Sequence, residues 1–401
     1  MNCRFCRKEL INEMVDLGFS PPSNSFLDTI GLLKSETSYP LRIMVCDECF
    51  LVQIDEFASH EDIFNGDYVY FSSYSTTWLE HCKKYSEDIT SQLNLDSSSL
   101  VVEIASNDGY LLQYFKEKKI PVLGIEPTTN TAEIAINKGI ETITEFFGVN
   151  CAHKLIASGR KADLLIGNNV LAHVPDINDF VRGLEILLKE DGVITMEFPH
   201  LLQLIDKNQF DTIYHEHFSY LSLLVVRRIF EYHGLTIFNV DEIATHGGSL
   251  RIYAKHKNNL SFSIQMSVEN LIRKEMNFGL DNIASYKNFQ IAVNKVKNDF
   301  VLFLIEQKRL NKKVSAYGAA AKGNALLNYC GVRKDLINFI SDASPHKQNK
   351  FIPGMHIPVV NEDRIKEEEP DFVVILPWNI KEEISRQLSY IHSWGGQFVV
   401  A

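Results

Sequence analysis

VVEIASNDGY, residues 101–110, is the stretch that decides the fold. Its apolar start predicts a buried strand, with the acid Glu103 near the end of that strand. Small and polar residues then make a turn over 105–109, and a helical run begins at Tyr110. A strand, a small-residue turn and a helix in this order begin the ligand crevice of an open α/β sheet. Small residues let the backbone approach a ligand, and a helix N-terminus presents unpaired N–H groups.

The second strand of this unit, predicted over 122–125, ends at Glu126. The turn is not a dinucleotide fingerprint, because G-x-G-x-x-G needs three glycines and the turn has only Gly109. An acid at the end of the second strand can hold both ribose hydroxyls of an adenosine. Glu103, the turn and Glu126 together resemble a class I S-adenosylmethionine-dependent methyltransferase. An ordinary strand-helix-strand unit with solvated acids is the alternative, and an NAD site is a more distant one.

Length and composition are those of a globular protein with more than one domain. The 401 residues are 45% apolar and 23% charged, which predicts two or three domains with ample core. The net charge of −11 argues against a nucleic-acid-binding surface. No apolar run reaches the roughly 20 residues of a membrane span, and the first residues carry no apolar signal-peptide core. We therefore expect a cytoplasmic monomer with neither nucleic acid nor membrane as a partner.

Four of the seven cysteines form two C-x-x-C pairs, Cys3 with Cys6 and Cys46 with Cys49. Two intervening residues let both thiolates of a pair face one tetrahedral ion, and a second pair completes the coordination of Zn²⁺. Four protein ligands leave no open position, so we expect a structural zinc ion. The 39 residues between the pairs predict a small sheet, with a strand over 39–45 leading into the second pair. Two unrelated redox or core cysteine pairs are the alternative.

Aromatic residues are concentrated in the stretch 60–80. They are Phe64, Tyr68, Tyr70, Phe71, Tyr74 and Trp78. These side chains either pack the zinc module onto the next domain or wall a sugar site, where rings stack and phenols donate hydrogen bonds. Their spacing alone does not choose between the two uses.

The strands after Glu126 predict where the crevice lies. A buried strand over 163–167 runs into Asn168 and, after a short loop, His173. Because ligands of open α/β sheets bind beyond the carboxyl ends of the strands, we expect Asn168 and His173 to face the site. Phe146 follows the third strand region and can pack against an adenine.

The stretch FDTIYHEHF, residues 210–218, holds consecutive polar side chains among apolar neighbours. Such a group is costly to bury unless it is hydrogen-bonded or functional. It is not HExxH, so a zinc-protease site is excluded. A strand would separate Tyr214 and Glu216 from His217, so convergence of the three on one substrate requires a loop or a helix start. A satisfied polar patch at a domain seam is the alternative.

A second α/β pattern follows the helical stretch 263–310. A strand over 313–317 enters the small-residue turn 318–324, and further strands are predicted over 336–340, 372–376 and 398–400. The turn is a candidate phosphate cradle, because it offers backbone N–H groups, no bulky side chains and one cation, Lys322. It lacks the GxxxxGK[ST] spacing of a Walker loop. Two Rossmann-like units would then face each other, one for a methyl donor and one for a nucleotide-linked substrate.

The whole chain resembles the nucleotide-sugar C-methyltransferases, which methylate a carbon of a keto-deoxysugar attached to a nucleoside diphosphate. The four N-terminal cysteines match the zinc domain of that family, and VVEIASNDGY matches its methyl-donor loop. GAAAKGNALLNYCG (318–331) and SPHKQNK (344–350) match its C-terminal domain. Ala105 departs from the family, in which glycine is commoner, and should narrow the loop without abolishing cofactor binding.

The resemblance implies three sets of site residues besides the cysteine ligands. The catalytic set is His217 as the base, Glu216, Tyr214, His173 and Tyr68. The set that binds the methyl donor is Glu103, Ala105, Asn107, Gly109, Glu126, Pro127, Phe146 and Asn168. The set that binds the substrate is Tyr70, Tyr317, Ala319, Lys322, Asp342 and Lys347.

The resemblance also implies an α/β architecture and an activity. We expect a small zinc-binding β domain over 1–75, a class I methyltransferase Rossmann-like domain over 76–262, and a second Rossmann-like domain over 263–401 that binds the nucleotide-sugar. The implied reaction moves a methyl group from S-adenosylmethionine to C3 of a 4-keto-deoxysugar through an enolate, in the biosynthesis of a branched-chain sugar. An enolate needs a base with a pKa near neutrality and a donor at the oxyanion. An O- or N-methyltransferase acting on a nucleotide-linked sugar is the runner-up, and a non-catalytic zinc scaffold is a third possibility.

Overall fold

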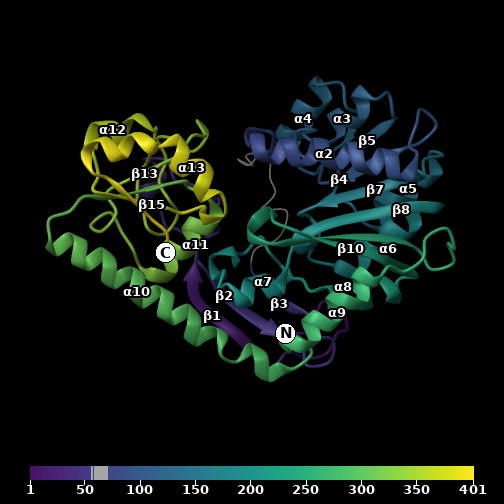
Figure 1. Cartoon of the computed structure of the whole chain (residues 1–401), viewed down its shortest axis with the longest axis horizontal. Helices are drawn as coiled ribbons and strands as arrows, with labels where there is room; N and C mark the ends of the chain where they lie inside the picture. The colour runs from purple at the N-terminus through teal and green to yellow at the C-terminus, as the bar shows by residue number, and fades with distance from the viewer. Residues whose placement is uncertain (56, 58–70) are drawn as a thin grey trace.

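The computed structural model describes residues 1–55, 57 and 71–401. The described residues form three sheets, of four, seven and five strands. Figure 1 shows the middle part of the chain in the right-hand lobe and the C-terminal part in the left-hand lobe. The N-terminal strands and the long helix α10 (Phe289–Arg309) lie along the lower side of the molecule and connect the lobes.

The seven-stranded sheet has the order β10-β11-β8-β7-β4-β5-β6. Its parallel strands are β4 (Val101–Ile104), β5 (Val122–Ile125), β6 (Thr142–Ile143), β7 (Ala162–Asn168) and β8 (Leu188–Pro199). An antiparallel hairpin of β10 (Leu235–Ile243) and β11 (Ser249–His256) extends the β8 edge. The chain runs outward from β4 to β6 and then returns to β7 on the other side of β4. This reversal creates a ligand crevice at the carboxyl ends of β4 and β7.

Alternate strand residues bury opposite faces of this sheet. Val101 and Leu164 pack in one cluster and Val102 and Leu165 in another, as the two-residue period of a strand requires. The helices over the first face are α2 (Thr76–Leu93), α3 (Leu112–Glu117) and α4 (Thr129–Asn137). Those over the second face are α5 (Val149–Ala157), α6 (Ile177–Leu187) and α8 (Leu223–Tyr232).

The four-stranded antiparallel sheet combines two distant parts of the chain. Its order is β1 (Asn12–Ser20), β2 (Tyr39–Val45), β3 (Val52–Ile54) and β9 (Ser219–Tyr220). Because β9 follows the stretch 210–218 directly, its pairing with β3 fixes that stretch against the N-terminal module.

The five-stranded sheet is parallel throughout. Its order is β14 (Val359–Val360), β13 (Ile340–Ser341), β12 (Val314–Tyr317), β15 (Phe372–Ile375) and β16 (Gln397–Val399). Its helices are α11 (Ala321–Cys330), α12 (Asp363–Glu368) and α13 (Lys381–Gln387). The strand order reverses between β12 and β15, which makes a second crevice at their carboxyl ends.

Two helices link the sheets. Helix α9 (Met266–Phe278) packs near β10, and α10 buries Phe289, Val293 and Phe300 in a core shared with the N-terminal and C-terminal sheets. The short helix α7 (Leu201–Asp206) belongs to the same core. Among the described residues, no helix combines the length and apolar character needed to cross a bilayer.

Several element boundaries differ from those that the sequence indicated. The sequence predicts a helix over 81–93, but helix α2 begins at Thr76, because Ser75 caps it by accepting a hydrogen bond from the Trp78 N–H. The strand expected over 336–340 is only the two-residue β13, and the β10–β11 hairpin was not anticipated. The other predicted strands agree with the structure to within a few residues.

Candidate active site and metal centre

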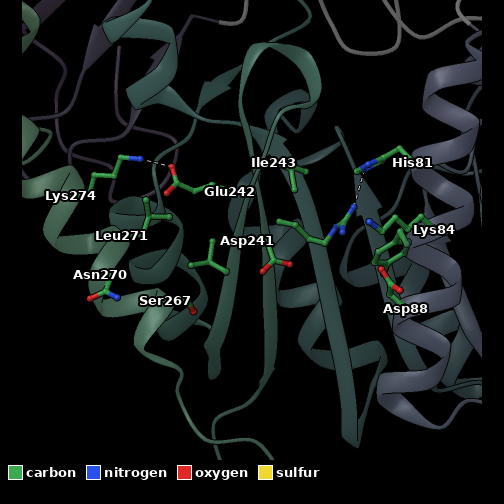
Figure 2. A pocket seen from close by; sticks show the side chains of 13 residues that line it. His81, Lys84, Asp88, Asp241, Glu242, Ile243, Ser267, Asn270, Leu271 and Lys274 are labelled. Carbon is green, nitrogen blue, oxygen red and sulfur yellow. Dashed lines mark hydrogen bonds and ion pairs between the residues drawn. The ribbon is translucent and has the colours of Figure 1, made fainter.

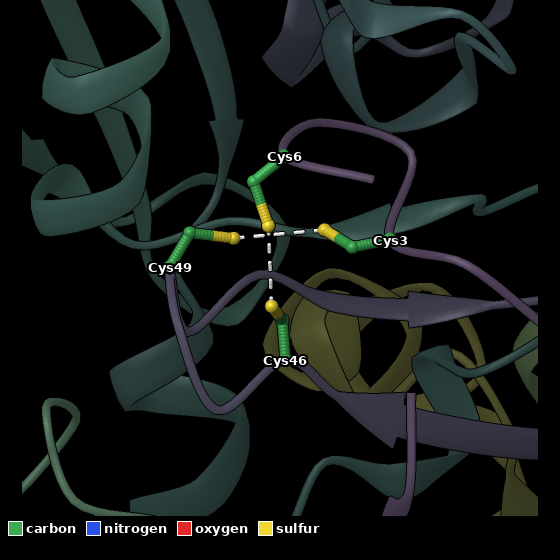
Figure 3. Close-up of side chains that lie close together, drawn as sticks. All are labelled: Cys3, Cys6, Cys46 and Cys49. Atoms are coloured by element: carbon green, nitrogen blue, oxygen red, sulfur yellow. Dashed lines mark hydrogen bonds between the residues drawn. The ribbon is translucent and has the colours of Figure 1, made fainter. Parts of the chain in front are cut away.

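The four N-terminal cysteines converge on one point (Figure 3). All four Sγ atoms lie within 4.8 Å of one another, with Cys3 3.6 Å from Cys49 and Cys6 3.4 Å from Cys46. Thiolates at roughly 2.3 Å from a tetrahedral Zn²⁺ stand at comparable separations. The fully buried Gln53 donates a hydrogen bond to Cys3 Sγ, as groups around a metal ligand commonly do. The cluster is a Cys₄ metal site with zinc geometry.

The turn after β4 has three residues in left-handed conformations. The φ angles are +57° at Ala105, +48° at Asn107 and +75° at Gly109. Glycine adopts this region without a steric cost, which explains why glycine suits position 105 and why alanine there carries some strain. At Gly109 the need is stricter, because a Cβ would lie 2.5 Å from the side chain of Ile140. The turn is therefore held tightly against Ala135 of α4 and against Ile140 in the connection that follows α4.

Three buried carboxyl groups surround this turn. Glu126 accepts hydrogen bonds from the Asn107 N–H at 2.8 Å and the Thr128 N–H at 2.9 Å. One carboxyl oxygen of Asp108 has no hydrogen-bond partner among the described residues, and the buried Glu103 carboxyl group lies beside the Tyr110 hydroxyl. Burial raises the pKa of Glu103 well above its ordinary value, although the Tyr110 hydroxyl lowers it, and the nearby charges of Glu126 and Asp108 raise it further. The raised pKa disfavours the ionised form of Glu103 in the ligand-free protein, so a bound cation or hydrogen-bond donor would favour its ionisation.

The other residues expected at this crevice lie around the same edge of the sheet. Asn168 is buried at the end of β7, beside Glu197 of β8. Pro127 is half-buried directly after Glu126. Phe146 is 42% exposed and follows β6.

The stretch 210–218 is a loop, the conformation that convergence of Tyr214, Glu216 and His217 on one substrate would require. It begins with a short 3₁₀ helix, η4 (Phe210–Thr212), and turns back on itself through a hydrogen bond from the His217 N–H to the Tyr214 carbonyl. His217 is 8% exposed, and its Nδ1 lies 2.8 Å from the Thr212 carbonyl. A carbonyl can only accept, so we assign the proton to Nδ1, which leaves the lone pair on Nε2. Burial lowers the pKa of His217 well below its ordinary value, so the imidazole is neutral at pH 7.

Two aromatic neighbours flank the His217 ring. The Tyr214 ring lies 4.0 Å from it and the His173 ring 4.7 Å, measured between centroids. His173 is in the 3₁₀ helix η3 (Leu171–His173), and its Nδ1–H donates to the Glu216 carbonyl at 2.7 Å. Burial lowers the pKa of His173 to about 4, so it too is neutral.

The Glu216 carboxyl group is buried against the N-terminal module. Asn24 donates to both of its oxygens, at 2.8 and 3.0 Å. Burial raises the pKa of Glu216 to about 7, while Asn24 and the charge of Lys347 lower it. Near pH 7 this group therefore exists in both forms and can either donate or accept a hydrogen bond.

The turn after β12 brings the C-terminal lobe to this loop. Lys322, in the first turn of α11, donates to Asn379 at 2.8 Å and lies 4.7 Å from the Trp378 ring centroid. Burial lowers the pKa of Lys322 to about 8, although the charge of Asp211 opposes this. Trp378 Nε1–H donates to Asp211 at 2.6 Å, which links the two lobes directly.

The remaining residues predicted for the substrate have internal partners. Asp342 accepts hydrogen bonds from the N–H groups of Ala319 at 2.7 Å and Ser344 at 2.8 Å, and Lys347 donates to the Ala319 carbonyl at 3.0 Å. The buried Tyr317 donates its hydroxyl proton to Glu362.

Tyr68 and Tyr70 lie outside the described residues. Their neighbour Phe71 is described, and its ring centroid is 5.4 Å from that of His346 in the C-terminal lobe.

Four residues at the site were missed by the sequence reasoning. Asn24 and Trp378 act across lobes, so no local pattern marks them, and Asp211 lies in the polar stretch 210–218 but its partner Trp378 is distant in the sequence. His246 carried a usable signal, since it precedes two glycines, Gly247 and Gly248, at the tip of the β10–β11 hairpin. It has φ +53° and lies 3.0 Å from Asn169.

A separate cavity of about 650 Å³ lies on the sheet face between α2, β10 and α9 (Figure 2). Its charged side chains are largely paired internally: Lys274 with Glu242, and Arg251 with His81 and Glu197. None of the predicted site residues lines it.

Comparisons with known proteins define the class. Family models match a zinc binding domain over residues 3–64, a methyltransferase domain over 78–240 and a C-methyltransferase C-terminal domain over 244–401. An S-adenosylmethionine-dependent methyltransferase from Clostridium acetobutylicum ATCC 824 aligns with 44% of this chain and 92% of its own, at 12% identity and a TM-score of 0.37. Magnesium protoporphyrin IX methyltransferase from Synechocystis PCC 6803 aligns with 44% and 82%, at 17% identity and a TM-score of 0.36.

The central domain has the class I fold of S-adenosylmethionine-dependent methyltransferases. C-methyltransferase NovU from Streptomyces niveus is 31% identical over 398 residues, which cover 99% of this chain and 94% of NovU. The chain therefore belongs to the C-methyltransferase family, and it is an enzyme that uses S-adenosylmethionine and carries a zinc-binding domain.

The turn after β4 fits this methyl donor chemically. S-adenosylmethionine brings ribose hydroxyls, an ammonium group and a sulfonium centre. Asp108 has a carboxyl oxygen without a partner among the described residues, and Glu103 has spare acceptor capacity beside Tyr110, and both match such donors and cations.

Proposed function

We propose that this C-methyltransferase acts on C3 of a 4-keto-deoxysugar linked to a nucleoside diphosphate, and that the reaction passes through an enolate. The observation that carries the proposal is His217. It is a buried, neutral imidazole whose Nδ1–H is engaged by the Thr212 carbonyl, so that Nε2 is available as a base. Proton removal from carbon requires such a base, whereas methylation of an existing hydroxyl or amine does not require an enolate.

The proton at C3 passes to Nε2 of His217, and the electron pair moves into the carbonyl to give an enolate oxyanion. The lowered pKa of His217 keeps the imidazole neutral at pH 7 and able to accept this proton, although it also makes His217 a weaker base than the near-neutral histidine expected from the sequence. A protonated Glu216 is suited to donate a hydrogen bond to the oxyanion or to a neighbouring hydroxyl, because burial raises its pKa to about 7. Tyr214, His173 and Tyr68 are assigned to holding and polarising the sugar.

When bound, S-adenosylmethionine would supply an electrophilic methyl carbon: the enolate carbon would form the new C–C bond as the methyl–sulfur bond breaks, S-adenosylhomocysteine would leave, and the C4 carbonyl would re-form. We assign the ribose of the donor to Glu126, and the rest of the donor to the 103–109 turn, Pro127, Phe146 and Asn168. Displacement is fastest when the reacting atoms are held in line at about 3–3.5 Å. The rigid turn around Gly109 supports such positioning.

The nucleoside diphosphate is assigned to the crevice of the C-terminal sheet. Lys322 and Lys347 carry the positive charge there. Lys322 lies over Trp378, which donates to Asp211 of the His217 loop, and the charge of Lys347 lowers the pKa of Glu216 in the same loop. The hydrogen bond from the Ala319 N–H to Asp342 fixes the turn after β12. We also assign Tyr317 and Tyr70 to the binding of the nucleotide-sugar.

The test is the identity of the methylated atom. The enzyme is incubated with S-adenosylmethionine carrying a ¹³C methyl group and with a panel of 4-keto-deoxysugars on dTDP, GDP or CDP. We expect one product, whose NMR spectrum shows the ¹³C methyl group attached directly to a carbon of the sugar ring. A product with the shift and couplings of an O-methyl or N-methyl group would contradict the proposal in favour of the runner-up activity.

A further inference from the structure

The proposed base is connected to the C-terminal lobe by a short chain of contacts. Trp378, which follows β15, donates its indole N–H to the Asp211 carboxyl group at 2.6 Å. Asp211 is 6% exposed and lies in η4. The next residue, Thr212, supplies the carbonyl that accepts the His217 Nδ1–H at 2.8 Å. A displacement of η4 would therefore move the group that fixes the tautomer of His217.

The charges around this chain are arranged in favour of an ionised Asp211. Burial raises the pKa of Asp211 to about 6, while the charge of Lys322 and the Trp378 N–H lower it. A hydrogen bond to an ionised acceptor is roughly twice as strong as a neutral one. At pH 7 the Trp378–Asp211 bond is therefore a strong anchor between the lobes.

The Trp378 ring is closely packed by residues of three elements. A Cβ at Gly247 would overlap the indole ring, so the ring is packed directly against the backbone of the β10–β11 hairpin tip. Gln209, which precedes η4, donates to the Gly247 carbonyl at 2.9 Å. Lys322 lies over the ring, and Asn379 holds its ammonium group. Trp378 thus contacts the C-terminal turn, the hairpin tip and η4 at once.

We propose that Asp211 and Trp378 are positioning residues that set the tautomer and orientation of His217. The catalytic part of this inference rests on the proposed role of His217 as the base. The structural part does not, because it concerns the protonation site of one imidazole in the resting enzyme. In this arrangement the C-terminal lobe supplies the contact that fixes His217, so His217 has the tautomer and orientation of a base only when that lobe is packed against η4.

The first experiment is NMR of the full-length enzyme with ¹⁵N-labelled histidine, with His217→Gln used to identify the signals of this residue. The wild type should carry the His217 proton on Nδ1. Trp378→Phe keeps a ring but removes the N–H donor, and we expect a population protonated on Nε2 and a rise in the His217 pKa as the loop loosens. Asp211→Asn keeps an acceptor of the same size, and we expect the same change at a smaller amplitude.

The matched control is Trp394→Phe. Trp394 donates its indole N–H to the Pro370 carbonyl at 3.1 Å in the same lobe, away from η4. It should leave the His217 signals unchanged. Unaltered His217 tautomer and pKa in both Trp378→Phe and Asp211→Asn would overturn the proposal, as would a wild-type proton on Nε2. If Trp378→Phe fails to fold, Asp211→Asn alone decides between these outcomes.

The second readout separates positioning from substrate binding. Misplacement of a catalytic group by about 1 Å can cost on the order of 10² in rate. We therefore expect Trp378→Phe to lower kcat by about 10- to 100-fold, with the KM for S-adenosylmethionine unchanged. A rise in the sugar KM with an unchanged kcat would assign Trp378 to substrate binding and contradict the positioning role. If no sugar is methylated at carbon, the proposed function fails, and the NMR result still decides the positioning role.

Discussion

Gly109→Ala should destabilise the methyltransferase domain by more than its backbone conformation alone explains. Gly109 has φ +75°, and a residue with a Cβ pays roughly 1–2 kcal/mol in this left-handed region. The new Cβ would also lie 2.5 Å from Ile140 Cδ1 and 3.3 Å from Ala135 Cβ. Overpacking in a dense core adds about 1–3 kcal/mol. The expected total is about 2–5 kcal/mol.

Gly159→Ala is the matched control for this substitution. Gly159 has φ +80°, but a Cβ there would meet nothing within 4 Å. Both variants gain the same few tenths of a kcal/mol from the stiffer unfolded chain, so this contribution cancels in the comparison. The difference between them isolates the overlap with Ile140 and Ala135.

Urea unfolding, monitored by circular dichroism, measures the difference in the free energy of unfolding between the two variants. The difference is obtained from the shift in the urea midpoint when both curves have the same slope. Gly109→Ala should unfold at clearly lower urea than Gly159→Ala, and it should also bind S-adenosylmethionine more weakly in calorimetry, because the turn can relax only by moving. Equal midpoints for the two variants would refute the argument that α4 packing confines the turn.

Three further outcomes are expected. Elemental analysis should show that Cys46→Ser has lost the zinc ion, and this variant should be less stable, since metal binding at a closed site contributes folding free energy. The control Cys151→Ser should keep its zinc, and a zinc-free, stable and fully active Cys46→Ser enzyme would exclude a structural role for the metal. Glu126→Gln should weaken calorimetric binding of S-adenosylmethionine while NAD binds to neither form; tight NAD binding without an S-adenosylmethionine signal would overturn the donor assignment. Lys322→Ala should raise the sugar KM by about 10- to 100-fold, the value of a charged hydrogen bond. In the wild type the affinity for the nucleotide-sugar should fall as the pH rises through about 8, where Lys322 loses its charge, and Asp211→Asn should move this fall to lower pH because Asp211 raises the Lys322 pKa. A sugar KM that depends neither on pH nor on Lys322 would remove this residue from the diphosphate site.

Local pattern was sufficient for the parts of the fold that are built from neighbouring residues. A strand that leads into the crevice can be identified from two local features. They are the alternation of Val101 and Val102 between two cores and the small residues after Glu103, and neither depends on distant parts of the chain. The C-x-x-C spacing likewise identifies the metal site, because two residues fix the geometry of each pair.

The parts that could not be predicted depend on contacts between distant residues. Asn24 holds Glu216 across 192 positions, and Trp378 holds Asp211 across 167. An asparagine or a tryptophan has many uses on a surface or in a core, so its identity alone does not indicate a partner. The β10–β11 hairpin was missed for a different reason: Gly247 and Gly248 mark its tip, but the connection is longer than a two-residue turn and also holds His246 in a left-handed conformation.

The central claim is that His217 removes a proton from the sugar carbon that receives the methyl group. Its most direct test is hydrogen exchange at C3 in D₂O, with the keto-sugar and a non-reactive analogue of the methyl donor, because this step requires no methyl transfer. The wild type should incorporate deuterium at C3, and Tyr214→Phe should do so slowly. His217→Asn should not incorporate it while still binding both ligands, since general-base catalysis is worth roughly 10²–10⁴ in rate. Exchange by His217→Asn as fast as by the wild type would contradict the account and assign the base to another residue.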